Sequence, residues 1–200
     1  MIKRRTLLGS TLSALALSLM ALSTAAYSAD TATAPVATSS APVASSALFN
    51  YVEEGHEALP LTTMDAATAQ QLAASFKYSQ EPEVVAQDVA YALMQQKGAV
   101  VVDVREPHEY AAGHIPGAFN IPKDTVLSNA DLAALKDKHI PIMVYCRSGG
   151  RAGDVLDALA EDGFSYVMSI GGVLTWPYGL TTEPTAKPFA EAAAEVKAVK

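Results

Sequence analysis

The only cysteine of this 200-residue chain lies in a short stretch that also holds two arginines and two adjacent glycines. The stretch reads Cys146-Arg147-Ser148-Gly149-Gly150-Arg151. An apolar segment at 141–145 precedes it and is typical of a buried strand, while alanine, valine and leucine recur at helical spacing from 152 to 160. We therefore expect the thiol between the end of a strand and the start of a helix.

This position favours nucleophilic chemistry. The N–H groups of a helix N-terminus attract anions, and Gly149 and Gly150 allow the backbone to curl around a ligand. Together with the charges of Arg147 and Arg151, these features favour thiolate over thiol and predict that Cys146 is a nucleophile. The simpler alternatives are a buried structural cysteine and, for Arg147, a solvated surface residue. The paired arginines and glycines argue against the first.

A second group of charged residues begins at the end of the apolar run at 99–104, with Asp103 and Arg105. We interpret this group as a frame for the site rather than as catalysts. Asp103 and Arg105 are predicted to form an ion pair at a strand end, and Glu109 is predicted to be a further partner of Arg105. His114 lies in a turn that it is expected to stabilise by hydrogen bonds.

No metal or cofactor is expected. One cysteine and four scattered histidines give no metal-ligand spacing, and a single Gly-Gly pair is not a nucleotide-binding fingerprint.

Helical and strand patterns alternate around these residues. Helices are expected at 87–96 and from 152 to 162, and strands at 99–104, within 113–122, at 142–145 and at 166–170. Ser128 and Asp131 are predicted to form a capping box for a further helix. This alternation predicts an α/β fold, with a small, mostly parallel sheet and helices on both faces. Ligands bind at the carboxyl ends of such strands, where Cys146 lies.

The N-terminus predicts export. Lys3, Arg4 and Arg5 precede an apolar run and then small residues, so residues 1–29 are interpreted as a signal peptide and the bacterial periplasm as the destination. Both the general and the twin-arginine export routes remain open. The alternative is an uncleaved membrane anchor; after cleavage, no stable membrane insertion is expected.

The rest of the chain divides by composition. Residues 30–47 are predicted to be a disordered Ala/Ser/Thr/Pro linker, 48–80 a helical appendage, 81–185 the folded domain, and 186–200 a tail that forms at best a fraying helix. The formal charge of −7 argues against nucleic acid and anionic membranes as partners.

Four ordered stretches resemble the rhodanese (thiosulfate sulfurtransferase) family. They are Val101–Tyr110, Gly113–Pro122, the Cys146–Ala152 loop and the closing segment from Gly171-Gly172 to Gly179-Leu180. The resemblance implies a rhodanese-like domain and a sulfurtransferase that works through a persulfide of Cys146. It implies a small anionic sulfur donor such as thiosulfate, bound by Arg147, Ser148, Gly149, Gly150 and Arg151, and a cyanide or thiol acceptor, with a periplasmic protein as a further candidate acceptor.

Two other functions remain open. One is a phosphatase or arsenate reductase of the same fold, but four residues separate Cys146 from Arg151, whereas protein phosphatase loops have five. The other is a non-enzymatic sulfur carrier or binding module for a periplasmic partner protein.

Overall fold

A parallel sheet forms the centre of the part of the chain that the structure, a computed structural model, describes, residues 61–200. Its order is β1-β5-β4-β2-β3, and every paired strand is parallel to its neighbour. The strands are β1 (Glu83–Val84), β2 (Val100–Asp103), β3 (Phe119–Asn120), β4 (Ile142–Cys146) and β5 (Val167–Gly172). The predicted signal peptide, linker and residues 48–60 of the appendage lie outside the described residues.

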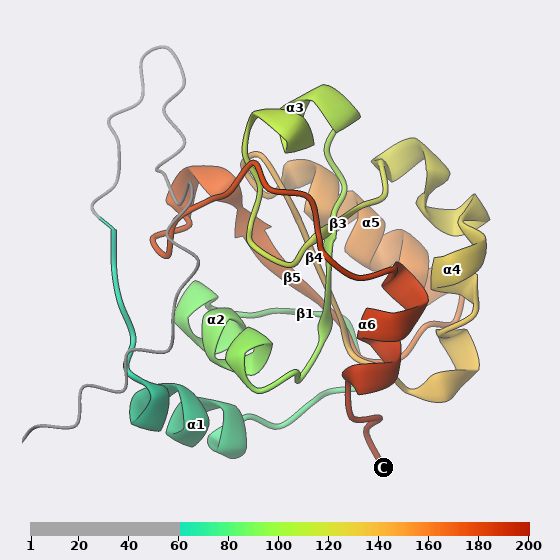
Figure 1. Cartoon of the computed structure of the whole chain (residues 1–200). Helices are drawn as coiled ribbons and strands as arrows, with labels where there is room; N and C mark the ends of the chain where they lie inside the picture. Colours follow the sequence, from blue (N-terminus) through green and yellow to red (C-terminus); the bar gives the residue numbers. More distant parts are fainter. Residues whose placement is uncertain (1–60) are drawn as a thin grey trace, which may run out of the picture. The chain divides into compact units, whose positions relative to one another are not determined.

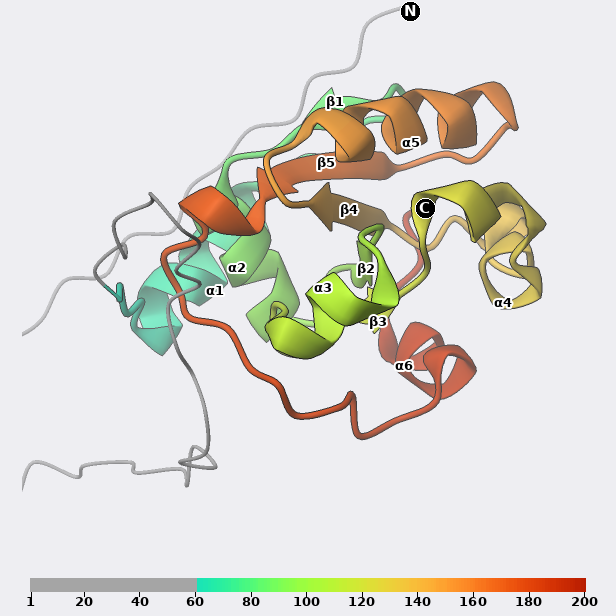
Figure 2. The ribbon, with the colours of Figure 1, turned by 90° about the horizontal axis from the view of Figure 1, so that it is seen from above.

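Helices cover both faces of this sheet. They are α1 (Ala66–Ser75), α2 (Gln87–Gln95), α3 (Pro107–Ala112), α4 (Ala130–Ala133), α5 (Gly150–Glu161) and α6 (Phe189–Glu195), with 3₁₀ turns η1 (Lys123–Ser128), η2 (Lys136–Lys138) and η3 (Val173–Thr175). Figure 2 shows the sheet between α5 on one side and α2 on the other. The predicted α/β fold, with helices on both faces of a parallel sheet, is confirmed.

The central strands β2 and β4 are apolar except for Asp103 at the end of β2, because both of their faces are covered. Val100 and Val102 of β2 belong to the core on the α5 side, whereas Val101 belongs to the core on the α2 side. All five residues of β4 are buried. This double burial holds the carboxyl end of β4, and with it Cys146, in a fixed position.

The N-terminal described segment lies against α2. α1 is beside α2 in both views (Figures 1 and 2), and Ala69 is buried there. The Tyr78 hydroxyl donates to the Gly98 carbonyl at 2.8 Å. Thr62 N–H donates to the Pro177 carbonyl at 2.7 Å, which fixes the start of the described chain beside the turn that follows η3.

The prediction of a fraying C-terminal tail is wrong. Three residues of this segment are buried in the α5-side core: Phe189, Ala193 and Val196. The rings of Phe189 and Phe119 meet edge to face, with 5.1 Å between their centroids. The composition is rich in alanine and charge, but the three buried residues recur at helical spacing on one face. Pro188 is the N-cap of α6.

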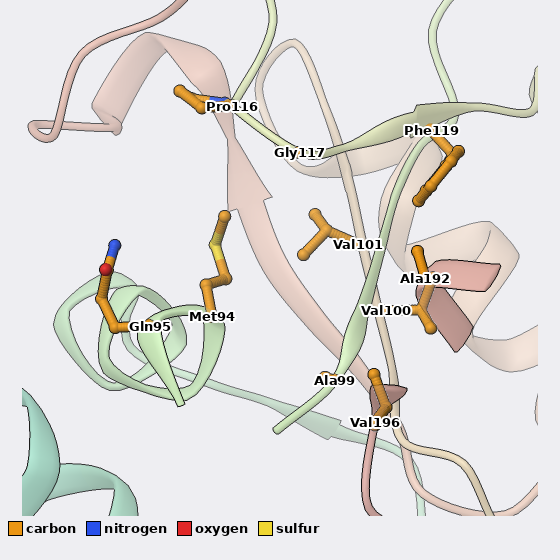
Figure 3. A pocket seen from close by; sticks show the side chains of 10 residues that line it. All are labelled: Met94, Gln95, Ala99, Val100, Val101, Pro116, Gly117, Phe119, Ala192 and Val196. Atoms are coloured by element: carbon orange, nitrogen blue, oxygen red, sulfur yellow. The ribbon is translucent and has the colours of Figure 1, made fainter. Parts of the chain in front are cut away.

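Small side chains on α6 leave space beside the sheet. A cavity of about 180 Å³ lies between α2, β2, the 116–119 segment and α6, with Met94, Val101, Phe119 and Val196 in its lining (Figure 3). The lining includes Ala99 and Val100 at the start of β2, so the cavity is at the opposite end of the strands from Cys146. No predicted site residue lines it.

The predicted capping box is also corrected. Asn129, not Ser128, is the N-cap of α4, and its side chain accepts the Leu132 N–H at 2.9 Å. Ser128 belongs to η1, where its hydroxyl donates to the Thr125 carbonyl. Serine and asparagine are both favourable N-cap residues. Because Ser128 is the last residue of the 3₁₀ turn η1, Asn129 is the N-cap of α4.

No helix among residues 61–200 has the length and apolar character needed to cross a membrane.

Candidate active site

Cys146 ends β4 and is followed by three loop residues before α5 begins at Gly150. The Gly149 N–H donates to the Cys146 sulfur at 3.1 Å. Gly149 is the N-cap of α5 with φ +109°, a backbone conformation that favours glycine. The twelve-residue helix thus begins beside the sulfur, so that its partial positive charge and one N–H group face the thiol.

The end of β5 packs against the backbone of the Cys146 loop. The register of β4 and β5 shifts between Val144↔Ser169 and Cys146↔Gly172, so one additional β5 residue brings Gly172 beside the cysteine. A methyl group on Gly172 would lie 2.3 Å from the Arg147 carbonyl oxygen. This close approach requires glycine. The Leu174 N–H, just beyond it, donates to the same carbonyl at 3.2 Å.

Gln87, the first residue of α2, fixes the segment 170–175, which packs against the loop. Its Nε2 lies 3.1 Å from the Ile170 carbonyl, 3.0 Å from the Gly172 carbonyl and 3.1 Å from the Thr175 hydroxyl. The sequence does not indicate this role of Gln87, because the residue appears there only as one polar position of an amphipathic helix. Its contacts are 83 to 88 positions away in the chain, and no local pattern indicates them.

Asp103 and Arg105 form a fully buried pair at the end of β2. Both side chains have no exposed surface. Nε and Nη2 of Arg105 donate to the Asp103 carboxylate at 2.6 to 3.0 Å, and Nη2 also donates to the Gly113 carbonyl at 2.6 Å. The pair thereby connects β2 to the segment that follows α3.

Tyr145, next to the cysteine, belongs to the same buried network. Its hydroxyl accepts the Ile115 N–H at 3.1 Å, and its ring lies 5.8 Å from the Arg105 guanidinium carbon. Burial raises the pKa of this hydroxyl well above its usual value, so Tyr145 stays neutral. The sequence predicts Tyr145 as a strand residue but does not indicate a role for its hydroxyl.

Glu109 pairs with Arg151, and its predicted pairing with Arg105 is corrected. Nη1 and Nη2 of Arg151 donate to the two carboxylate oxygens of Glu109 at 2.6 and 2.7 Å. These hydrogen bonds lower the pKa of Glu109 to about 2 and raise that of Arg151. Nε and Nη2 of Arg105 donate to Asp103 and the Gly113 carbonyl, and α3 directs Glu109 toward the start of α5 instead. α3 lies beyond the carboxyl ends of the strands (Figure 1).

His114 connects α3 to the C-terminal part of the domain. Its ring nitrogens lie 2.9 Å from the Tyr110 carbonyl and 3.0 Å from the Glu183 carbonyl, and its backbone forms an antiparallel bridge with Thr181. Burial lowers the pKa of His114, although the two carbonyls partly oppose this effect. Its contacts are structural, and it is not beside the sulfur in any of them.

The structure therefore joins Glu109 to Arg151 at the start of α5, next to the Cys146 loop. It places Asp103, Arg105 and His114 in a separate set of contacts with the residues of α3 and the segment after it. Ser148 is exposed and Arg147 is partly exposed on the loop. Within residues 61–200, no group of three or more His, Cys, Asp or Glu side chains is placed to hold a metal ion. The arrangement offers one thiol, one backbone N–H that donates to it, and an arginine whose charge is paired with Glu109.

Comparison with known proteins agrees with this geometry. Residues 86–177 match the family profile described as Rhodanese-like domain. The chain is similar to "Thiosulfate sulfurtransferase GlpE" of Pseudomonas entomophila, with 41% identity over 87 residues, which cover 42% of this chain and 74% of the relative. The protein of the same name from Pseudomonas putida F1 is 40% identical over 91 residues, 44% of this chain and 77% of the relative.

Among solved structures, a human single-domain sulfurtransferase matches with a TM-score of 0.40 and 26% identity, over 44% of this chain and 88% of that one. The profile match and the curated relatives carry the assignment. The chain belongs to the rhodanese-like family.

Proposed function

We propose that the protein is a sulfurtransferase that moves sulfane sulfur from a donor such as thiosulfate to cyanide or a thiol, through a persulfide on Cys146. The observation that carries this proposal is the 3.1 Å hydrogen bond from the Gly149 N–H to the Cys146 sulfur at the start of α5. An N–H donor and a helix N-terminus at one sulfur stabilise an anion there. Both the thiolate and the persulfide are anions.

The reaction divides into two displacements. In the first, the Cys146 thiolate attacks the outer sulfur of thiosulfate, a new S–S bond forms, and the bond to the sulfonate sulfur breaks with its electron pair leaving on sulfite. In the second, cyanide or a thiolate attacks the outer sulfur of the persulfide and releases the Cys146 thiolate, with thiocyanate or a new persulfide as product. Electrons and charge balance in each step, and no metal or cofactor is required.

Incubation with thiosulfate tests the nucleophile. The wild-type protein should gain the mass of one sulfur atom, cyanide should remove it, and Cys146→Ser should gain none. Turnover with thiosulfate and cyanide, beside a phosphate-ester assay, separates the enzyme from the alternatives. Loading without turnover would indicate a sulfur carrier, and phosphate-ester hydrolysis would indicate a phosphatase. Loading that persists in Cys146→Ser would overturn the mechanism.

We also propose that the protein is exported to the bacterial periplasm. The support is the basic, apolar and small-residue order of residues 1–29. Fractionation of expressing cells tests this proposal, because the mature chain should be in the periplasmic fraction with its N-terminus shortened. An uncut chain in the cytoplasm would overturn it.

A further inference from the structure

Glu109 of α3 and Arg151 of α5 connect two helices at the Cys146 loop. The two residues are 42 positions apart in the sequence and make a bidentate contact at 2.6 and 2.7 Å. Oε2 of Glu109 also accepts the Glu106 N–H at 3.0 Å, which ties the carboxylate to the first turn of α3. The carboxylate is therefore held at both sides, and the plane of the Arg151 guanidinium is fixed with it.

The contact also changes the charge at the sulfur. Arg151 is the second residue of α5, and the N-cap of that helix, Gly149, donates its N–H to the Cys146 sulfur at 3.1 Å. In agreement with this placement, Cys146 contributes to the raised pKa of Arg151, after the larger contribution of Glu109. A carboxylate in bidentate contact compensates that positive charge locally. The side chains of Arg151 and Glu109 are only 31% and 16% exposed, so water screens this interaction incompletely. A sulfur-donor substrate that binds at Cys146 therefore contacts a guanidinium whose positive charge is already compensated by the Glu109 carboxylate.

We infer that Glu109 is a positioning and specificity residue: it holds Arg151 at the Cys146 loop and shifts the preference of the loop from the thiosulfate dianion toward singly charged sulfane-sulfur donors. This inference rests on the proposed function. Thiosulfonates, R–SO₂–S⁻, are donors of the favoured class. The Cys146 thiolate attacks their outer sulfur, the bond to the sulfonyl sulfur breaks, and a sulfinate leaves with the electron pair, so that one persulfide forms per donor.

The expected effect follows from charge. The Glu109 carboxylate repels a dianion more than a monoanion, and it lowers the attraction that Arg151 offers to either. Glu109→Gln keeps an oxygen that accepts from Arg151 but removes the negative charge. The ratio of kcat/KM for thiosulfate to kcat/KM for methanethiosulfonate should rise about fivefold in this variant at low ionic strength. The rise should shrink at high ionic strength, where salt screens the carboxylate.

Glu106→Gln is the matched control, because it removes one carboxylate from the same end of α3 without touching Arg151. It should leave the ratio near the wild-type value. Arg151→Gln leaves Glu109 uncompensated and should lower the ratio below the wild-type value, which a purely structural role of the pair would not do. Persulfide loading, followed by intact mass, shows that each variant is folded and reactive.

The outcomes separate the two proposals. Equal ratios in Glu109→Gln and Glu106→Gln, or an equal loss with both donors in Glu109→Gln, would overturn the inference and leave the sulfurtransferase intact. Failure of the wild-type protein to form a persulfide with either donor would overturn the proposed function, and the inference with it.

Discussion

Two arginine–carboxylate pairs lie at the same end of the sheet, in different surroundings. Arg105 and Asp103 have fully buried side chains, and the arginine also donates to the Gly113 carbonyl. Arg151 and Glu109 are partly exposed and face the cysteine loop. The two contacts have similar distances, 2.6 Å for the shortest in each, so geometry alone does not distinguish them.

The difference in burial separates their roles. A buried ion pair gains little over an apolar pair, but removal of one partner leaves an uncompensated charge in the core. A partly exposed pair contributes little to stability, so its charge can change without unfolding the protein. The buried pair therefore constrains the fold, whereas the loop pair can determine the chemistry at Cys146.

The largest effect is expected from Asp103→Asn. The variant leaves the Arg105 charge buried without its carboxylate, which should lower the free energy of unfolding by about 3–5 kcal/mol. Glu109→Gln, the corresponding change in the loop pair, should cost about 1 kcal/mol or less. Urea denaturation of both variants measures the difference. A loss in Asp103→Asn no larger than that in Glu109→Gln would contradict the assignment of the buried pair to the frame.

A smaller effect on stability, with a clear effect on rate, is expected from Gly172→Ala. The added methyl would lie 2.3 Å from the Arg147 carbonyl, so the loop must move. We expect a cost of about 1–3 kcal/mol in stability and a loss of about tenfold or more in kcat/KM for thiosulfate. Gly153→Ala is the control, because nothing lies within 4 Å of its added methyl. Wild-type kinetics in Gly172→Ala would show that the contact between the end of β5 and the loop does not position the sulfur.

The sequence was sufficient where local pattern determines structure. The apolar run at 99–104 and the segment before Cys146 are β2 and β4, and the helical spacing after the loop is α5, because continuous apolar runs and 3.6-residue periodicity depend on neighbouring residues only. The position of Cys146 between a strand and a helix follows from these two patterns. The parallel sheet follows from their alternation.

The sequence was insufficient where partners are distant or where several residues compete. Glu109 had two arginines available, and only the orientation of α3 shows that Arg151 is its partner. Gln87 contacts β5 and η3 across more than eighty positions. In α6 and its C-cap, the average composition concealed the narrow apolar face formed by Phe189, Ala193 and Val196. Each error concerns tertiary packing that overrides a local signal.

The smallest effect is expected in the pH dependence of the loop pair. The pKa of Glu109 falls from 4.5 to about 2 in the folded protein because Arg151 donates to its carboxylate. The folded protein therefore binds fewer protons than the unfolded chain between these values, so the contribution of Glu109 is complete above pH 4.5 and is lost as the pH falls toward 2. For a partly exposed pair we expect a contribution of about 1 kcal/mol.

Glu109→Gln removes the titrating group and should be less stable than the wild type above pH 4.5, with a difference that shrinks as the pH falls toward 2. Urea denaturation of both proteins at neutral pH and at two acidic values measures this difference. Glu106→Gln again controls for the general loss of a carboxylate from α3. A difference between wild type and Glu109→Gln that stays constant down to the lowest pH would mean that Arg151 does not stabilise the ionised form of Glu109. In that case the charge at the loop would not be compensated, and the contrast with the buried Asp103–Arg105 pair would rest on exposure alone.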